Sequence, residues 1–437
     1  MLNRDIHTIF YNAINAVHPS TLLPKNLEVG KKDLVIAGHC IHLAGIDRFM
    51  IIAAGKAAAA MCQQAENILG ELLSGGICVT KYRHALPLRK ITLTEAGHPV
   101  PDQHSLEAGE KALQIAKGLS QRDILLLLIS GGASSLLADL PPGCTLAELQ
   151  KCFDLLVNSG ATIGEINTIR KHLSRIKGGQ LVNAAGGARI FSLIISDVPG
   201  DDLQTIGSGL SVGDASSFSD ALNILHKYTL TDKIPESILH YIEGGFRGTY
   251  PDTPFPNDPV FEQVVNIIIG KAADAVRAAI TSAGEKGYHL IEAKENLSGN
   301  TEEKAREFMN LLLAYEGPLP ACLIWSGETT LRVHTPGKGG RNQHFALSAL
   351  KALKEKSQAG KKFSVLCAGT DGTDGPTDAG GAFIHSGMLD DPSITAELIE
   401  AHLRNFNAYP FFEERDSLLI TGPTQTNVMD LVIGIIE

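Results

Sequence analysis

Two short glycine-rich turns in the first half of the sequence carry side chains that could bind anionic groups. Lys56 follows the apolar run 49–54 directly, and a serine-rich turn follows the apolar run 124–129. Glycine lets the backbone approach a ligand, hydroxyls donate hydrogen bonds, and backbone N–H groups at a helix start attract phosphate or carboxylate. A tight turn with serine N-caps is the competing interpretation of the second turn. Its residues are Ser130, Gly131, Gly132, Ala133, Ser134 and Ser135.

Lys56 stands at the opening of an alanine-rich stretch. Gly55 precedes it and Ala57–Ala60 follow. These small side chains cover little of the lysine's alkyl chain, so the ammonium can point into a crevice beyond the strand end. We interpret it as an anion-binding or catalytic lysine, whereas the alternative is a solvated surface lysine. Lys271 follows the apolar run 265–270 in a similar GKAA setting and is the weaker candidate.

The segment 167–177 is predicted to be a helix with one cationic face. At about 100° per residue, its polar residues fall on one side and Ile169, Leu173 and Ile176 on the other. In a chain of net charge −10, this concentration of cations favours an anion pocket over a solvated basic face. The polar face consists of Asn167, Arg170, Lys171, Ser174 and Lys177.

Two further segments could carry phosphoryl or carboxylate chemistry. Asp197 ends the apolar run that begins at Phe191, where a carboxylate can orient a hydroxyl, hold Mg²⁺ or cap a turn. In the second half, Arg341 follows a loop with three glycines and could grip a carboxylate or phosphate with two hydrogen bonds. A flexible loop is the alternative there. The same loop carries Lys338 and Gly340 as candidate binding residues.

Asp371 and Asp374 follow another apolar run, 363–368, and could hold Mg²⁺ together with bridging phosphates. The loop is not an EF-hand, because Ala382 stands where position twelve requires Glu. Hydrogen bonds from the aspartates to their own loop backbone are the competing interpretation.

The elements that must position these residues alternate between short apolar runs and helix-like stretches. Continuous apolar runs fit strands buried on both faces, and their alternation with helices predicts an α/β fold with mostly parallel sheets in three α/β/α layers. At 437 residues the chain is long enough for two domains. Residues 244–259 contain three glycines and four prolines and read as a linker. We therefore predict domains at 1–243 and 260–437.

Composition excludes several classes of protein. The net charge of −10 and an aromatic content of 5% argue against nucleic-acid binding. The apolar runs are too short to span a membrane, and the N-terminal residues lack the apolar core of a signal peptide, so we expect a cytoplasmic protein. The seven cysteines include no C-x-x-C pair. Neither a G-x-x-x-x-G-K-[ST] loop nor a G-x-G-x-x-G turn after a strand occurs, which disfavours a P-loop NTPase and a standard dinucleotide fold.

A series of motifs in order along the chain resembles the glycerate 2-kinase family that carries a MOFRL domain, some members of which are labelled hydroxypyruvate reductases. The matching motifs are AAGKAA (53–58), GHPVPD (97–102), SGGASSLL (130–137), EINTIRKHLSRIKGGQL (165–181), SDVPGDD (196–202), IGSGL (206–210), KGGRNQ (338–343), GTDGTDGPTDAGGA (369–382) and TNVMDL (426–431). Three positions depart from the usual pattern: His344 replaces Glu, and Ser326 and Gln425 each replace Gly.

The resemblance implies an ATP- and Mg²⁺-dependent kinase that converts D-glycerate to 2-phosphoglycerate. Lys56 and Arg341 match the family's proposed active-site lysine and arginine, and the resemblance implies two α/β domains with the site in the cleft between them. We assign Asp197 to orienting or deprotonating the C2 hydroxyl. An NAD(P)H-dependent hydroxypyruvate reductase and a non-catalytic binding protein for small anions remain alternatives. The sequence leaves open whether the chain forms a homodimer and which domain holds ATP.

Overall fold

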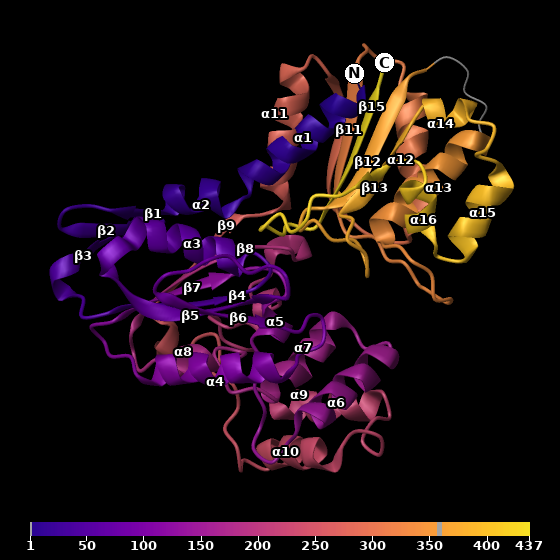
Figure 1. Cartoon of the computed structure of the whole chain (residues 1–437). Coiled ribbons are helices and arrows are strands. Elements are labelled where there is room, and N and C mark those ends of the chain that lie inside the picture. Colours follow the sequence, from indigo (N-terminus) through magenta and orange to yellow (C-terminus); the bar gives the residue numbers. More distant parts are fainter. Residues whose placement is uncertain (1, 356–360) are drawn as a thin grey trace. The chain divides into compact units, whose positions relative to one another are not determined.

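The chain forms two compact units, which we describe from a computed structural model covering residues 2–355 and 361–437 (Figure 1). One unit comprises Leu22–Ile269. The other combines Met1–Thr21 with Gly270–Glu437. Residues 244–259, the expected linker, belong to the first unit. Backbone N–H groups of Asp214 and Phe218 hold them there by donating to the Pro254 carbonyl (2.9 Å) and the Asp252 carboxylate (2.8 Å).

The Leu22–Ile269 unit is built on a six-stranded sheet in the order β6-β5-β4-β7-β8-β9. Neighbouring strands from β6 to β8 are parallel, as the apolar runs predicted. A three-stranded antiparallel sheet, β1-β2-β3, is added near the start of the unit. The strands are β1 (Leu27–Val29), β2 (Asp33–Ile36), β3 (His39–His42), β4 (Phe49–Ala54), β5 (Leu73–Lys81), β6 (Ile91–Ala96), β7 (Ile124–Ile129), β8 (Arg189–Ile195) and β9 (Val264–Gly270).

Helices cover both faces of this sheet. Helix α3 contacts β4, β5 and β7, and α4 and α8 cover the opposite face (Figure 1). Four further helices, α6, α7, α9 and α10, enclose an apolar core of their own. The helices are α2 (Pro19–Asn26), α3 (Ala58–Leu69), α4 (Gln103–Lys117), α5 (Ala133–Leu136), α6 (Leu146–Asn158), α7 (Ile163–His172), α8 (Gln180–Ala184), α9 (Phe218–Lys227) and α10 (Glu236–Phe246).

The second unit also has three α/β/α layers, but its sheet is mixed. In the order β10-β11-β15-β12-β13-β14, only β10 and β11 are parallel neighbours. The C-terminal strand β15 inserts antiparallel between β11 and β12, and β13 and β14 follow as antiparallel neighbours. The α/β class is thus confirmed for both units, whereas the mostly parallel arrangement holds for the first sheet alone. The strands are β10 (His289–Leu297), β11 (Ala321–Gly327), β12 (Phe363–Gly369), β13 (Gly381–His385), β14 (Leu418–Leu419) and β15 (Asp430–Ile436).

The first helix of the chain belongs to this second unit. Helix α1 packs against α11, β12 and β15, and its buried residues include Ile6, Ile9 and Phe10. Helices α12 and α13 cover the other face of the sheet (Figure 1). The helices are α1 (Leu2–Ala16), α11 (Ala272–Glu285), α12 (Thr301–Ala314), α13 (Arg341–Glu355), α14 (Gly387–Asp390), α15 (Ala396–Arg404) and α16 (Ala408–Glu413).

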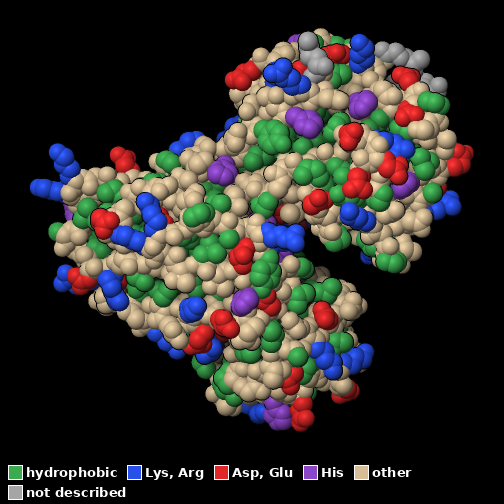
Figure 2. All heavy atoms as spheres, viewed as in Figure 1, with side chains coloured by type: hydrophobic (Ala, Val, Ile, Leu, Met, Phe, Trp, Pro, Cys, Tyr) green, Lys and Arg blue, Asp and Glu red, His purple; other side chains and the backbone are tan. Residues whose placement is uncertain are grey.

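The surface carries charges of both signs. Acidic and basic side chains are interspersed over the face seen in Figure 2, which therefore offers no broad area of one sign. Across residues 2–355 and 361–437, no helix combines the length and the apolar character needed to cross a membrane.

Candidate active site

The turn after β4 and the turn after β7 are joined by hydrogen bonds. Ala54 and Ile129 end these two strands side by side. The Lys56 N–H donates to the Gly131 carbonyl (2.9 Å), and the Ala57 N–H donates to Ser130 Oγ (3.0 Å). The sequence placed Lys56 and the serine-rich turn 74 residues apart (130 − 56), and the sheet brings their backbones into contact.

Gly55 makes this close approach possible. Its φ is +131°, and a Cβ atom there would lie 2.2 Å from Ser130 Oγ. Any larger residue would force the Lys56 and Ser130 turns apart. The two turns also lie where the strand order reverses direction, between β4 and β7, which is where open α/β sheets bind their ligands.

Asp197 lies at the same edge of the sheet. It follows β8, which pairs in parallel with β7, so the carboxyl ends of β4, β7 and β8 point the same way. The structure thus places Lys56, Ser130 and Asp197 at one edge of the sheet, because residues that follow neighbouring parallel strands lie at the same edge. Asp197 is half-buried.

A chain of hydrogen bonds links three of the sequence motifs. Ser134 Oγ and Ser208 Oγ are 2.7 Å apart, and Ser208 donates to Asn167 Oδ1 (3.2 Å). The same Asn167 oxygen accepts from Arg170 Nη1 (2.9 Å). Ser208, in the IGSGL motif, therefore couples the serine-rich turn to the cationic helix α7. The sequence of the IGSGL motif did not distinguish Ser208 from its neighbours.

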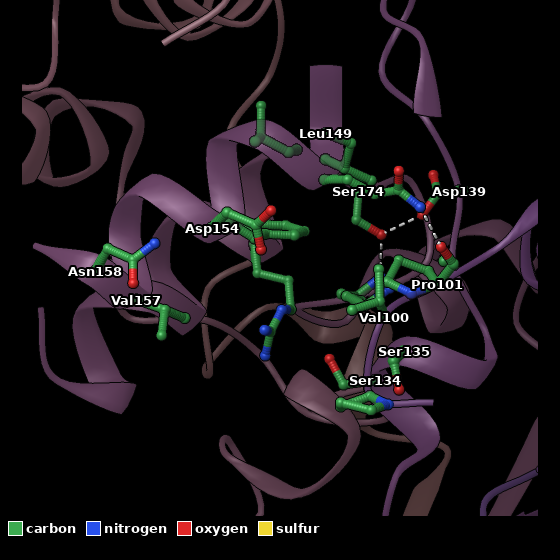
Figure 3. Close-up of a pocket in the computed structure, with 17 residues that line it drawn as sticks. Val100, Pro101, Ser134, Ser135, Asp139, Leu149, Asp154, Val157, Asn158 and Ser174 are labelled. Carbon is green, nitrogen blue, oxygen red and sulfur yellow. Dashed lines mark hydrogen bonds between the residues drawn. The ribbon is translucent and has the colours of Figure 1, made fainter. Parts of the chain in front are cut away.

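A pocket of about 330 Å³ opens beside this chain of hydrogen bonds (Figure 3). In Figure 3, Asp154, Val157 and Asn158 of α6 lie on one side, Val100 and Pro101 on the other, and Ser134 and Ser135 border it from below. Helix α6 is fixed by a capping box, in which Thr145 and Glu148 satisfy each other's backbone N–H groups. The other lining residues are Pro99, Ala138, Asp139, Leu149, Gln150, Phe153, Arg170, Leu173, Ser174 and Lys177.

Two of the predicted binding cations line the pocket. The guanidinium of Arg170 lies 5.0 Å from the centre of the Phe153 ring, and burial lowers the pKa of Arg170. Lys177 is 3% exposed and its Nζ donates to the Leu137 carbonyl (2.9 Å). Burial lowers the pKa of Lys177 to about 8, with Arg170 acting in the same direction and Asp139 opposing it. Removing two cations from water is costly, so the arrangement favours an anionic ligand.

The helix expected to run from 167 to 177 ends earlier. Helix α7 stops at His172, and Leu173, assigned to the opposite apolar face, lines the pocket with Lys177. Lys171 differs from the expectation in another way. Its Nζ donates to Asp214 Oδ1 (3.2 Å) in a pair whose side chains are 6% and 1% exposed. Lys171 and Arg170 are neighbours about 100° apart on the helix, so they face different surroundings.

We expect Asp214→Asn to destabilise the fold by about 3–5 kcal/mol, because it leaves the buried Lys171 ammonium without its counter-charge. Urea unfolding of the full chain, followed by circular dichroism, measures the loss. The double variant Lys171→Met/Asp214→Asn should recover part of it. Equal unfolding midpoints for Asp214→Asn and the wild type would show that this pair contributes nothing to stability.

In the second unit, Arg341 forms ion pairs with two carboxylates. Its Nε and Nη2 donate to Asp430 (2.6 and 3.0 Å), and Nη2 also lies 2.8 Å from Glu328 Oε1. Burial opposes the charge of Arg341, but these carboxylates outweigh it and raise its pKa. The sequence predicted a guanidinium that grips a carboxylate with two hydrogen bonds, and the structure supplies that carboxylate from the protein itself, at the start of β15.

Asp374 caps the helix that Arg341 begins. Its two oxygens accept from the backbone N–H groups of Asn342 (3.0 Å) and Gln343 (2.8 Å), and burial raises its pKa to about 7. Gly340 is required here, because a Cβ atom would lie 2.2 Å from the Asp374 carboxyl carbon. Lys338 Nζ lies 3.5 Å from the centre of the Tyr409 ring.

The residues proposed for Mg²⁺ do not form a protein cage. Asp371 Oδ1 accepts from the Thr373 N–H (2.9 Å), and Asp374 is occupied as a helix cap. Within residues 2–355 and 361–437, no three His, Cys, Asp or Glu side chains are grouped to hold a metal ion. Metal binding by Asp371 and Asp374 therefore stays a prediction.

Comparison with known proteins places these motifs in a family. A model described as a domain of unknown function (DUF4147) matches residues 5–243, and the MOFRL family model matches residues 321–430. The chain is 38% identical to a D-glycerate 2-kinase of Thermotoga maritima, covering 90% of this chain and 91% of the relative. It is 36% identical to a glycerate 2-kinase of Pyrococcus horikoshii, covering 97% and 95%. The chain belongs to the glycerate 2-kinase family with a MOFRL domain. A solved structure described as a glycerate kinase from Thermotoga maritima has a TM-score of 0.82, at 34% identity, over 99% of each chain.

The structure shows the surroundings of the three positions that depart from the pattern of the glycerate 2-kinase family. Gln425 has φ = +62°, in the left-handed region that favours glycine, which accounts for the glycine usual at this position. His344 Nε2 lies 3.0 Å from Glu302 Oε1, and its ring stacks on Phe406 at 5.6 Å. Ser326, the third departure, donates to the Asp430 carbonyl (3.0 Å).

Proposed function

We propose that this chain is a glycerate 2-kinase, which transfers the terminal phosphoryl group of ATP to O2 of D-glycerate. The decisive support is the match in sequence over nine tenths of the chain to relatives named as glycerate 2-kinases. The geometry agrees with such chemistry, because Lys56, Ser130 and Asp197 gather at the sheet edge where ligands bind. The choice of O2 rests on the family alone.

Phosphoryl transfer requires positioning and charge neutralisation more than covalent catalysis. We assign Lys56 and Arg341 to neutralising charge on the transferred group and on the glycerate carboxylate. Asp197 orients or deprotonates the attacking hydroxyl. Ser130–Ser135, Arg170 and Lys177 bind phosphate or carboxylate oxygens.

In this proposal Mg²⁺ binds together with the nucleotide. Mg²⁺ keeps several waters and is commonly held by one or two carboxylates together with substrate phosphates. Asp371 is the better of the two predicted ligands, because Asp374 already accepts two backbone N–H groups. We assign no step of the reaction to the metal.

One observation favours the reductase alternative. The strand order β6-β5-β4-β7-β8-β9 is the 3-2-1-4-5-6 order of dinucleotide-binding folds. In those folds the first turn carries G-x-G-x-x-G, whereas here Gly55 alone is followed by Lys56 and alanines. Ala57 stands in place of the second glycine, and its Cβ atom does not let a pyrophosphate approach the backbone as closely, so the kinase is the better supported function.

A pair of assays on the purified full chain separates the proposals. Glycerate-dependent ADP release, with the product identified as 2-phosphoglycerate by NMR, is the result we expect. Hydroxypyruvate-dependent loss of NADH without ATP would instead assign a reductase. Calorimetric binding of glycerate with no turnover in either assay would leave a small-anion-binding protein.

Lys177 should impose an alkaline limit on the activity. An anionic ligand favours the charged ammonium, so kcat/KM is expected to fall as pH rises above about 8, approaching about tenfold per pH unit. Asp139, Arg170 and Asp154 are the other charged groups at this pocket. The Lys177→Arg variant stays charged and should lose this fall. If its pH profile keeps the wild-type alkaline limb, the limb belongs to another group.

A further inference from the structure

The pocket in Figure 3 has a mostly apolar lining, which a three-carbon acid does not need. Glycerate is polar over its whole surface, whereas Pro99, Val100, Pro101, Leu149, Phe153 and Val157 form much of the wall. Val157 on α6 is 62% exposed and Val100 on the facing loop is 51% exposed, so apolar groups flank the mouth from two sides. Pockets of this size and character bind ligands with a large apolar part.

The opposite part of the pocket is cationic and hydroxylic. Among residues 2–355 and 361–437, Arg170 has no ion-pair partner. Its guanidinium donates to Asn167 Oδ1 and lies over the Phe153 ring. Lys177 donates to a backbone carbonyl. The one deeply buried carboxylate in the lining, Asp139, is engaged by Ser174 Oγ and the Arg175 N–H (2.6 Å). The two cations therefore have hydrogen-bonding capacity left for an external anion.

The cationic part also leads toward Lys56. Ser134 and Ser135 line the pocket, and Ser130 and Gly131 of the same turn bind the backbone of residues 56 and 57. A ligand with an apolar ring at one end and a row of anionic groups at the other would thus direct its anionic end to the proposed catalytic lysine.

We propose that this pocket is the ATP site, with the adenosine between Val100 and Val157 and the phosphates at Arg170, Lys177 and Ser134. The inference rests on the proposed kinase function and deepens it, because it assigns the nucleotide to the Leu22–Ile269 unit. Glycerate, lacking an apolar part, binds elsewhere along the same sheet edge.

Calorimetric titration of the full chain with two probes tests the two ends of the site separately. The non-hydrolysable analogue AMP-PNP carries both the nucleoside and the phosphates, whereas tripolyphosphate carries the anionic end alone. Arg170→Gln should raise Kd at least tenfold for both probes, and Arg170→Lys should recover part of the loss. Val157→Ser should raise Kd for AMP-PNP two- to fivefold and leave tripolyphosphate unchanged. Because Val157 is largely exposed, its variant tests the site without endangering the core. Val29→Ser, an exposed valine in β1, is the matched control and should change neither Kd.

Steady-state kinetics complete the test. In both pocket variants KM for ATP should rise while KM for glycerate stays within twofold. A rise in KM for glycerate with unchanged AMP-PNP binding would make this the acid site and overturn the proposal, as would unchanged kinetics in both variants. A third outcome separates the two proposals. If AMP-PNP binding weakens in these variants as expected but the wild type releases no ADP with glycerate, the kinase function is refuted and the nucleotide site is retained.

Discussion

Replacing Lys56 by alanine is expected to lower kcat/KM for glycerate phosphorylation by about a hundredfold. Lys56 follows the carboxyl end of β4, at the point where the strand order reverses, and its backbone is hydrogen-bonded to the serine-rich turn. A preorganised cation at this place stabilises charge that develops in the transition state without reorganisation. Coupled ADP-release kinetics, with circular dichroism to verify folding, measure the effect.

The sequence offers a matched control for this variant. Lys271 has the same GKAA context, but it follows β9, the outermost strand of the sheet, away from the reversal between β4 and β7. Lys271→Ala should therefore retain kcat/KM within about twofold of the wild type. Similar losses in both variants, or near-normal kinetics for Lys56→Ala, would remove Lys56 from the catalytic site.

The strands of the sheet interiors could be predicted because burial on both faces leaves an unbroken apolar run. The runs at 49–54, 124–129 and 363–368 became β4, β7 and β12. The same signal does not record strand direction, since a central strand is equally apolar whether its neighbours run parallel or antiparallel. For this reason β15, which inserts antiparallel between β11 and β12, made the second sheet mixed against expectation.

The partner of α1 could not be predicted either. Its apolar stripe indicates that one face is buried but not against which surface. The structure joins α1 to the C-terminal unit through packing and through polar contacts, such as Asp5 with Lys286 (2.7 Å) and Asn3 with Ser364 (3.0 Å). These contacts span most of the chain and have no local pattern that sequence reasoning could detect.

For the candidate site, the positions of the turns at the strand ends were predictable, and the choice between neighbouring cations was not. Glycines and serines after an apolar run predicted a turn at 130–135 beyond a strand end, and the structure has this turn after β7; its role in anion binding stays a prediction. The assignment of cations depended on one helix continuing to Lys177, but α7 ends at His172. Arg170 and Lys177 nevertheless line the pocket, whereas Lys171, about 100° from Arg170 on the helix, is held by Asp214, whose role had no sequence signal.

The second large effect is expected at Arg341. Arg341→Met removes the cation from between Asp430, which is 4% exposed, and Glu328, and should destabilise the fold by on the order of 3 kcal/mol. The guanidinium side chain is 34% exposed, so the effect should fall at the lower end of those seen for buried pairs. If Arg341 also neutralises charge in the reaction, kcat/KM should fall more than tenfold in any variant that remains folded.

A double variant separates these two roles. In Arg341→Met/Asp430→Asn the carboxylate is neutralised with the cation, so the melting temperature should recover part of its loss while kcat/KM stays low. Arg341→Lys retains a charge but cannot reproduce the two parallel hydrogen bonds to Asp430, so it should be active at an intermediate level. Recovery of both stability and kcat/KM in the double variant would mean that Arg341 only holds Asp430 and the start of α13 in place. Persistent loss of activity in a stable protein would instead require a role for the guanidinium in the reaction itself, because no structural defect would remain to explain it.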